Sequence, residues 1–193
     1  MKTGKTVKVL LTAATAAGML AGCGSKTDTD TFRFASELDI QGMDSTVVDD
    51  GMSFNAIHAI TDGLTAVNEK GKTAPALAKS WDVSDDGKTY TFHLRDAKWS
   101  NGDKVTANDF VYSWRKIIKD AGNYAYMLGN GGASVKNADA LMELGANATD
   151  EQMATLGVTA KDDKTLVVEL ENKVPYFTDL MAFPCYFPQN EKF

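Results

Sequence analysis

The sequence is poor in the residues that build metal centres and catalytic sites. It has two histidines, His58 and His93, which lie 35 positions apart, and two cysteines, Cys23 and Cys185. A metal site needs several such ligands at fixed spacing, and that spacing is missing here. The motifs of a serine nucleophile elbow, a dinucleotide fingerprint and a zinc protease helix are missing as well. The sequence therefore predicts no metal, no cofactor and no enzymatic activity.

Three pairs of adjacent aspartates are the remaining candidates for acid–base chemistry. They are Asp49-Asp50, Asp85-Asp86 and Asp162-Asp163. Each pair lies in a predicted turn, where aspartate is favoured because its side chain hydrogen-bonds the nearby backbone. We therefore interpret the three pairs as solvated turns and not as paired catalytic acids.

Positive charge is also scarce. The chain has 20 lysines and arginines against 26 acidic residues, which gives a net charge of −6. An acidic surface is repelled by nucleic acid and by anionic lipid headgroups. The sequence therefore predicts that nucleic acid is not a partner.

The first 22 residues have the three-part layout of a signal peptide. Lys2, Lys5 and Lys8 give a positive start, and an apolar run of 13 residues follows over 9–21. A membrane-spanning helix needs roughly 20 apolar residues, so this run is too short to span. It leads into Leu20-Ala21-Gly22-Cys23, which resembles the lipobox of bacterial lipoproteins. The resemblance implies that Cys23 is lipidated and becomes the mature N-terminus.

A lipidated Cys23 leaves Cys185 without a partner for an internal disulfide. The apolar residues around Cys185 favour a buried thiol over a reactive one. Removal of the leader would take away three lysines and no acid, and would change the net charge from −6 to −9. Residues 24–30, which follow the cysteine, are polar and suit a flexible tether.

Periodic patterns in the mature chain predict both strands and helices. Alternating apolar residues predict strands over 31–35, 90–94 and 166–170, and another strand is expected to start at Trp81. The pair Asp86-Gly87 predicts a hairpin turn before the second of these. The mixture of elements predicts an α/β domain.

Candidate capping residues and a proline predict several helices. Ser53 is a candidate N-cap for a helix that would end at Gly63, and Pro75 is expected to open a short helical turn over 75–81. A capping box at Thr106–Asp109 predicts a longer helix. Its apolar stripe consists of Phe110, Val111, Trp114, Ile117 and Ile118. Further helices are expected over 137–144, 150–155 and 176–181.

Five ordered motifs resemble the extracellular solute-binding proteins of the oligopeptide and dipeptide class. They are Leu77-Ala78-Lys79-Ser80-Trp81, Asp86-Gly87, Phe92-His93-Leu94-Arg95, Trp99-Ser100-Asn101-Gly102 and Thr106-Ala107-Asn108-Asp109. Each motif alone is weak, but five in order within about forty residues are specific. One departure is Met43-Asp44-Ser45, where the family often has Leu-Asp-Pro.

The resemblance implies a three-lobed α/β receptor of the periplasmic-binding-protein type II, which closes like a hinge on an extended peptide. It places the signal peptide at 1–22, the tether at 23–31 and the start of lobe one at 32–61. Lobe two would cover 62–188, and 189–193 would return to lobe one. Lobe three and the rest of lobe one would lie outside this chain. We therefore expect a fragment that binds peptide weakly or not at all.

The resemblance also implies a function and its residues. The whole protein would be a monomer, lipid-anchored on the outer face of the cell membrane. It would bind oligopeptides by strand addition and deliver them to the permease of an ABC importer, which works with ATPase subunits. Asp50, Gly51 and Met52 match a segment that pairs with the ligand backbone, and Tyr124 matches an aromatic residue that touches the ligand.

Several alternatives stay open. From the residues alone, Asp50 fits a solvated turn and Tyr124 fits core packing. A related cargo, such as a pheromone, a cell-wall peptide or a metal chelate, would suit the same fold. A surface adhesin or chaperone-like lipoprotein would no longer need the cleft.

The substitution Cys23→Ser tests the lipid anchor. A serine hydroxyl cannot form the thioether, so the variant should leave the membrane fraction or accumulate as an unprocessed precursor. Immunoblots of membrane and soluble fractions measure this, with Cys185→Ser as the matched control that should stay membrane-bound. An unchanged membrane fraction and an unchanged size for Cys23→Ser would contradict the prediction.

Overall fold

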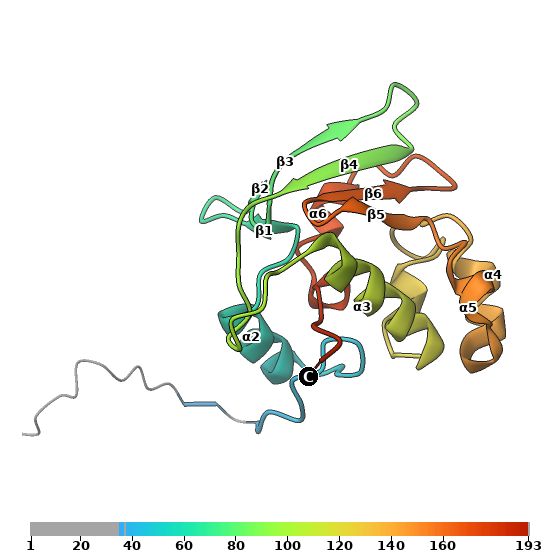
Figure 1. Ribbon diagram of the computed structural model, residues 1–193. Coiled ribbons are helices and arrows are strands. Elements are labelled where there is room, and N and C mark those ends of the chain that lie inside the picture. Colours follow the sequence, from blue (N-terminus) through green and yellow to red (C-terminus); the bar gives the residue numbers. More distant parts are fainter. Residues whose placement is uncertain (1–34, 37, 193) are drawn as a thin grey trace, which may run out of the picture. The chain divides into compact units, whose positions relative to one another are not determined.

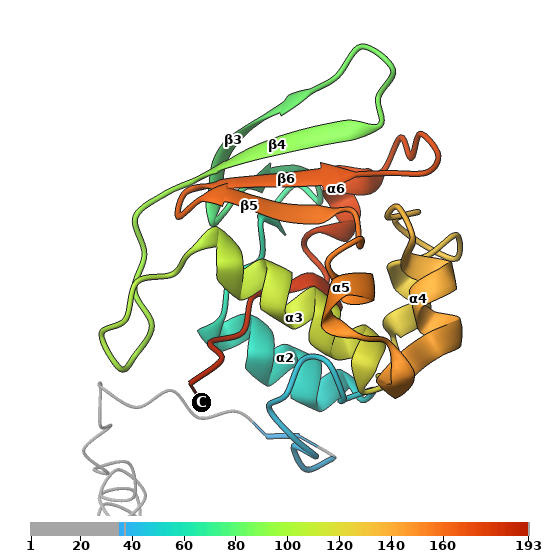
Figure 2. The ribbon, with the colours of Figure 1, turned by 45° about the vertical axis from the view of Figure 1, so that its right-hand side comes forward.

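A four-stranded antiparallel sheet organises the part of the chain that the structure describes. The computed structural model describes residues 35–36 and 38–192. The strands lie in the order β3 (Ala78–Val83), β4 (Thr89–Leu94), β6 (Thr165–Glu169) and β5 (Val158–Asp162). Figures 1 and 2 show the long helix α3 (Ala107–Lys119) along one face of this sheet.

The hairpin of β3 and β4 confirms the turn predicted at Asp86-Gly87. Gly87 has a φ of +68°, which glycine adopts without steric cost. In the register of the two strands, Trp81 faces Phe92 and Val83 faces Tyr90. Every second residue of β4 (Tyr90, Phe92 and Leu94) is buried, as the alternation predicts.

The helical turn predicted over 75–81 is wrong. Residues 73–75 form strand β2 (Thr73–Pro75), which pairs with β1 (Thr65–Val67), and β3 already begins at Ala78. The N–H of Leu77 donates to the carbonyl of Gly63 at 2.9 Å, and that of Ala78 donates to Leu64 at 3.0 Å. These partners lie 14 residues away in sequence, so a local pattern could not reveal them.

The second hairpin confirms one predicted strand and adds another. β6 matches the strand predicted over 166–170 to within one residue, and Leu166 and Val168 are buried. Its partner β5 was not predicted. Only Val158 of β5 is buried and most of its other residues are polar, so this edge strand has no clear apolar alternation.

The long helix α3 forms as the capping box predicts. The carboxylate of Asp109 accepts from the backbone N–H of Thr106 at 2.7 Å and from the indole of Trp99 at 3.2 Å. All five residues of the predicted stripe are buried under the sheet. The cap fixes where α3 starts, and the stripe fixes which side of the helix meets the sheet.

Short helices fill the connections between these elements. They are η2 (Ala125–Met127), α4 (Ala138–Leu144), η3 (Gly145–Asn147), α5 (Asp150–Met153), α6 (Phe177–Leu180) and η4 (Pro184–Tyr186). The helices predicted over 137–144, 150–155 and 176–181 are confirmed, although α5 ends at Met153. The strand predicted over 31–35 lies, apart from Ala35, outside the described residues.

Helix α2 (Gly51–Ile60) precedes the sheet, and it ends earlier than the glycine signal indicates. Its C-cap is Thr61, in an extended conformation, so Gly63 is not the helix stop. A Cβ atom on Gly63 would lie 2.4 Å from the carbonyl oxygen of Met181 and 2.5 Å from the ring of Phe187. Gly63 is therefore needed for close packing of two chain segments.

Two clusters of buried apolar residues hold the described part together. The larger one lies between the sheet and α3 and includes Tyr90, whose ring lies 4.4 Å from that of Phe177. The smaller one joins Val48, Ile57 and Phe187, with Phe54 packed against it. Cys185 lies buried in the larger cluster, which confirms the expected buried thiol. The smaller cluster connects α2 to the end of the chain.

Truncation of Phe92 should test the larger core. Phe92 is fully buried, so Phe92→Ala should lower the free energy of unfolding by about 3–5 kcal/mol through lost burial and the cavity left behind. Urea denaturation followed by circular dichroism measures the change. Val83→Ala on the neighbouring strand, where 47% of the side chain is exposed, is the control and should cost much less. Equal losses in the two variants would contradict the assignment of the core.

Candidate functional site

Asp50 caps the start of α2. Asp50 has an extended backbone, and its Oδ1 accepts from the N–H of Ser53 at 2.8 Å, so Asp50 is the N-cap. The N-cap predicted at Ser53 is therefore wrong. The hydroxyl of Ser53 instead accepts from the backbone N–H groups of Gln41, at 3.0 Å, and Gly42, at 3.2 Å. The interpretation of Asp49-Asp50 as a plain turn is thus refined to a helix cap.

Asp50 keeps unused capacity for a hydrogen bond. Its Oδ2 has no contact with solvent and no hydrogen-bond partner among the described residues. Hydrogen bonding to Ser53 lowers the pKa of the Asp50 carboxyl, which keeps the group ionised at neutral pH. An acceptor oxygen of this kind suits a donor that arrives with a ligand or a water molecule.

Gly51 and Met52 form the first turn of α2 and are helical. The first N–H groups of a helix have no carbonyl four residues earlier to bind. Because Gly51 and Met52 take this position, their N–H groups point out of the helix start. Beside the hydrogen bonds from Ser53, the N–H of Met52 also helps to lower the pKa of the Asp50 carboxyl. They can donate to an acceptor, but they do not offer the extended backbone that a strand ladder needs.

An aromatic cluster lies beside this helix start. The ring of Phe54 lies 5.4 Å from that of Tyr124 and 5.1 Å from that of Phe183, and Tyr124 lies 5.2 Å from Phe183. The fourth member, Tyr126, is stacked on Tyr124 at 6.0 Å and is 52% exposed. Three segments that are far apart in sequence therefore share one aromatic surface.

The loop before α2 is tied to the same place. The side-chain amide of Asn123 donates to the carbonyl of Val47 at 3.1 Å and to the carboxylate of Asp49 at 3.0 Å. The structure thus brings the predicted site segments 50–52 and 124 together. Tyr124 is half-buried and packs against the larger core, so a packing role is present beside any role at a ligand. Phe183 and Asn123 were not predicted as neighbours of the site, because no local pattern relates them to residues 50–52.

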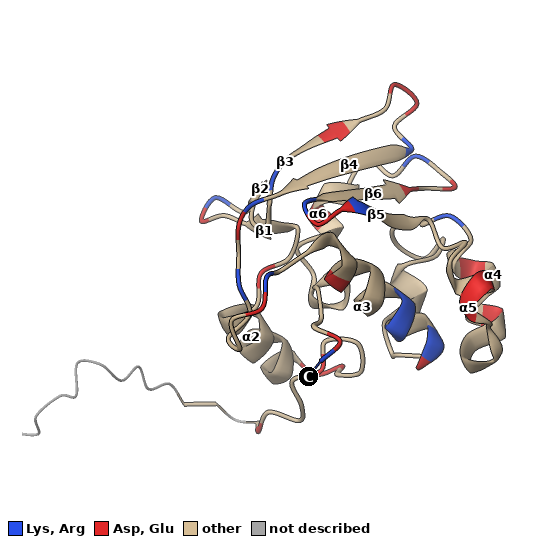
Figure 3. Ribbon diagram, viewed as in Figure 1, with Lys and Arg blue, Asp and Glu red and all other residues tan. Residues whose placement is uncertain are grey.

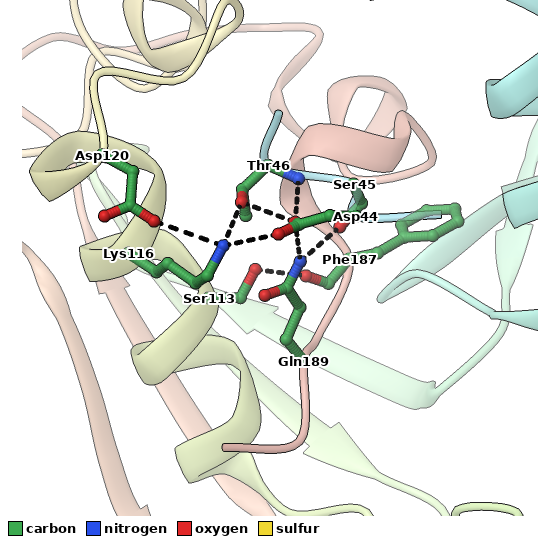
Figure 4. A network of polar contacts seen from close by, with 8 residues as sticks. All are labelled: Asp44, Ser45, Thr46, Ser113, Lys116, Asp120, Phe187 and Gln189. Atoms are coloured by element: carbon green, nitrogen blue, oxygen red, sulfur yellow. Dashed lines mark hydrogen bonds and ion pairs between the residues drawn. The ribbon is translucent and has the colours of Figure 1, made fainter. Parts of the chain in front are cut away.

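A polar network holds the loop in place, as Figure 4 shows. Lys116 of α3 donates to Asp44 at 2.7 Å and to the hydroxyl of Thr46 at 2.8 Å, and it pairs with Asp120 at 3.3 Å. The second oxygen of Asp44 accepts from Gln189 at 2.6 Å. Asp44 belongs to the segment that departs from the family pattern, and the network joins that segment to α3 and to the end of the chain.

The hydrogen bonds of this network control the charge of Asp44. Partial burial acts to raise the pKa of the Asp44 carboxyl, but hydrogen bonds from Lys116, Thr46 and Gln189 outweigh burial and lower the pKa to about 2. Asp44 is therefore ionised across the physiological range, and its ion pair with Lys116 is present throughout that range.

Cavities flank α2 on two sides. One, of about 580 Å³, is lined by Asn55, His58, Phe183 and Phe187 among others. The other, of about 670 Å³, is lined by Met43, Ile57 and Trp99 among others. Both volumes lie in the range of small-molecule sites, roughly 300–1,000 Å³.

The two histidines do not form a metal site. His58 is exposed, with its ring edge-on to Phe187 at 5.2 Å, and partial burial lowers its pKa. His93 lies on the sheet and contacts Asp82 at 2.8 Å. Within residues 35–36 and 38–192, no group of three His, Cys, Asp or Glu residues is placed to hold a metal ion.

Neither cysteine gives evidence of reactivity or of lipidation within the described residues. Burial raises the pKa of the Cys185 thiol, which disfavours a reactive thiolate. No helix among the described residues is both long and apolar enough to cross a membrane. Cys23, the predicted lipidation site, lies outside the described residues.

Comparison with known proteins gives a consistent result. Residues 72–193 match the model of the bacterial extracellular solute-binding proteins, family 5. A dipeptide-binding protein of Lactococcus lactis is 39% identical over 100% of this chain and 34% of its own length. The oligopeptide-binding protein OppA of Bacillus subtilis is 42% identical over 76% of this chain and 26% of its own length.

Solved structures agree with the sequence relatives. The substrate-binding domain of an oligopeptide ABC transporter from Bacillus anthracis matches with a TM-score of 0.75 and 41% identity, over 82% of this chain and 30% of that one. OppA of Listeria monocytogenes bound to peptide matches with a TM-score of 0.70 and 40% identity, over 78% and 28%. The α/β fold predicted from the sequence is thereby confirmed, and the chain spans about a third or less of the length of these proteins.

Acid titration should reveal the network around Asp44. The folded-state pKa of about 2 lies below the ordinary value of 3.8, so the stability from Asp44 is full above about pH 4 and is lost as pH falls toward 2. We expect about 1 kcal/mol from this group, less than the whole shift implies, because 43% of the side chain is exposed to screening water. Asp44→Asn should remove this part of the pH dependence of the free energy of unfolding, measured by urea denaturation.

Asp85→Asn, in an exposed hairpin turn, is the matched control and should keep the wild-type pH dependence. If Asp44→Asn and the wild type lose the same free energy between pH 4 and pH 2, the network contributes nothing to stability.

Proposed function

The chain belongs to the bacterial extracellular solute-binding proteins of family 5, and from that premise we propose that it forms part of an oligopeptide-binding lipoprotein of an ABC importer. The observation that carries the proposal is the convergence of α2's start and Tyr124 on one aromatic surface. The names of its relatives, which bind dipeptides and oligopeptides, support peptide as the cargo. A binding role also suits a site that has aromatic rings and backbone donors.

We also propose the division into lobes that is expected from the sequence. We assign 32–61 to the start of lobe one, 62–188 to lobe two and 189–193 to the return into lobe one. All strands of the two sheets lie within 62–188 as far as the structure describes the chain, and so does most of the larger core. The smaller core and the Asp44 network lie where the three parts meet.

The arrangement supports a specific way of holding a peptide. The N–H groups of Gly51 and Met52 at the start of α2 would donate to carbonyl groups of the peptide backbone. The Asp50 carboxylate would accept from a backbone N–H, and Tyr124 would lie against a peptide side chain. Contacts to backbone groups are common to all peptides, so such a site would bind many sequences. Because Gly51 and Met52 are helical, this part of the contact would be a helix-terminus contact and not a strand ladder.

The location and the partners of the whole protein follow from the same proposal. Lipidation at Cys23 would anchor it on the outer face of the cell membrane, and the polar tether would let the receptor reach its permease. The permease, driven by its ATPase subunits, would accept the peptide. No catalytic step is needed for capture and delivery.

A hybrid protein tests the function. In it, this chain replaces the matching part of the Bacillus subtilis relative, which supplies the remaining lobes. Mixed-sequence peptides should raise the melting temperature of the hybrid, because a ligand stabilises the folded state by RT ln(1 + [L]/Kd). Tyr124→Ala in the hybrid should weaken peptide binding about fivefold or more, measured by calorimetry.

Tyr176→Ala is the matched control, since Tyr176 is an exposed tyrosine outside the aromatic cluster. A folded hybrid that gives no thermal shift with any peptide would refute the proposal. Equal affinity of the isolated chain and the hybrid would refute the expected need for the other lobes.

A further inference from the structure

A cavity away from the aromatic cluster has no part in the proposed peptide site. It has a volume of about 580 Å³ and is lined by residues of α3 and α5, by Asp120 at the end of α3 and by Glu191. Figure 3 shows basic residues on the C-terminal half of α3 and acidic residues on α5. The size falls in the range of small-molecule sites, roughly 300–1,000 Å³.

Arg115 is the unusual residue of this cavity. Its Nε has no contact with solvent and no hydrogen-bond partner, and among the described residues its guanidinium group forms no ion pair. The two lysines beside it are paired: Lys116 with Asp44 and Lys119 with Asp150, each at 2.7 Å. A half-buried arginine with unused donors is costly unless an acceptor arrives from outside.

One other lining residue, Glu191, carries the opposite charge. Its carboxylate forms no hydrogen bond or ion pair with any residue in the described ranges. The lining also includes Val111 and Met153, both buried, and the half-buried ring of Tyr112.

The cavity thus combines Arg115, which forms no ion pair among the described residues, with the unpaired carboxylate of Glu191 and an apolar surface. The pKa of the Asp150 carboxyl is lowered by its pairing with Lys119, and the charge of Arg115 also helps to lower it.

We propose that this cavity binds a small zwitterion with an apolar side chain, the chemistry of a free α-amino acid. The planar guanidinium of Arg115 suits the carboxylate, which it can hold by two parallel hydrogen bonds. Glu191 faces the ammonium group, and the side chain of the ligand covers Val111 and Met153. The proposal does not rest on the proposed peptide function, because it uses none of the residues of that site.

Calorimetric titration of the 193-residue chain with L-leucine tests the proposal. We expect saturable binding with a dissociation constant of about 1 mM or below. Two analogues separate the charges: 4-methylpentanoate lacks the amine of leucine, and 3-methylbutylamine lacks its carboxylate. Each analogue should bind about tenfold more weakly than leucine, because each leaves one charged group of the protein without its partner.

Variants of Arg115 and Glu191 test which charged group of the ligand each residue binds. Arg115→Gln should weaken leucine binding about tenfold or more, and Arg115→Lys should have an intermediate effect, since it keeps the charge and loses the fork. Glu191→Gln should weaken the binding of leucine and leave the binding of 4-methylpentanoate unchanged. Arg95→Gln, at the Arg95–Asp62 pair outside this cavity, is the matched control and should leave leucine binding unchanged.

Three results would overturn the proposal: no saturable leucine binding to the wild type, equal binding of leucine and 4-methylpentanoate, or full leucine binding by a folded Arg115→Gln. Each result leaves the peptide function intact, because that function is measured on the hybrid protein with mixed peptides. Conversely, loss of peptide binding in the hybrid has no bearing on the leucine titration.

Discussion

The ion pair between Asp44 and Lys116 is the interaction on which the arrangement of the site depends. Asp44 lies in the loop before α2, Lys116 lies on α3, and Gln189 comes from the last residues of the chain. All three meet at one carboxylate, whose low pKa keeps it charged. A partly buried ion pair loses hydration, so it stabilises the fold only when hydrogen bonds replace the lost water. The carboxylate of Asp44 accepts four such bonds: one from Lys116, one from Gln189, and one each from the backbone N–H and the hydroxyl of Thr46.

This junction positions α2 relative to the sheet. The loop that starts at Asp44 continues through Val47 and Asp49, which Asn123 holds, to the cap at Asp50. The aromatic rings of Phe54, Tyr124 and Phe183 then pack on one another. The polar contacts hold the loop before α2 in place, and the packing of the aromatic rings holds α2 against the segments that carry Tyr124 and Phe183. The donors at the helix start are therefore presented by a rigid support, as a binding site requires.

The two ends of α3 serve different purposes. Its start is fixed by the Asp109 cap and the indole of Trp99, and the middle of the helix fills the core beneath the sheet. Its last turns carry Arg115, Lys116 and Lys119, of which only the lysines are paired within the described chain. One amphipathic helix thus supplies core packing, the link to the Asp44 loop and the cationic side chains of the cavity between α3 and α5.

The sequence by itself determined the features whose causes are local. The Asp86-Gly87 turn, the alternation of β4, the capping box and the stripe of α3 each depend on residues a few positions apart. The five motifs were sufficient to identify the family, because these local features occur in a fixed order along the chain. Tertiary structure alone decided the strand at 78–83, whose partners include residues 63–64, and the edge strand β5. It also decided that Asp50, and not Ser53, caps α2, because the Ser53 hydroxyl is occupied by Gln41 and Gly42. Hydrogen bonds and packing between distant segments leave no periodic trace in sequence, and the contacts of Phe54 with Tyr124 and of Asp49 with Asn123 are of that kind.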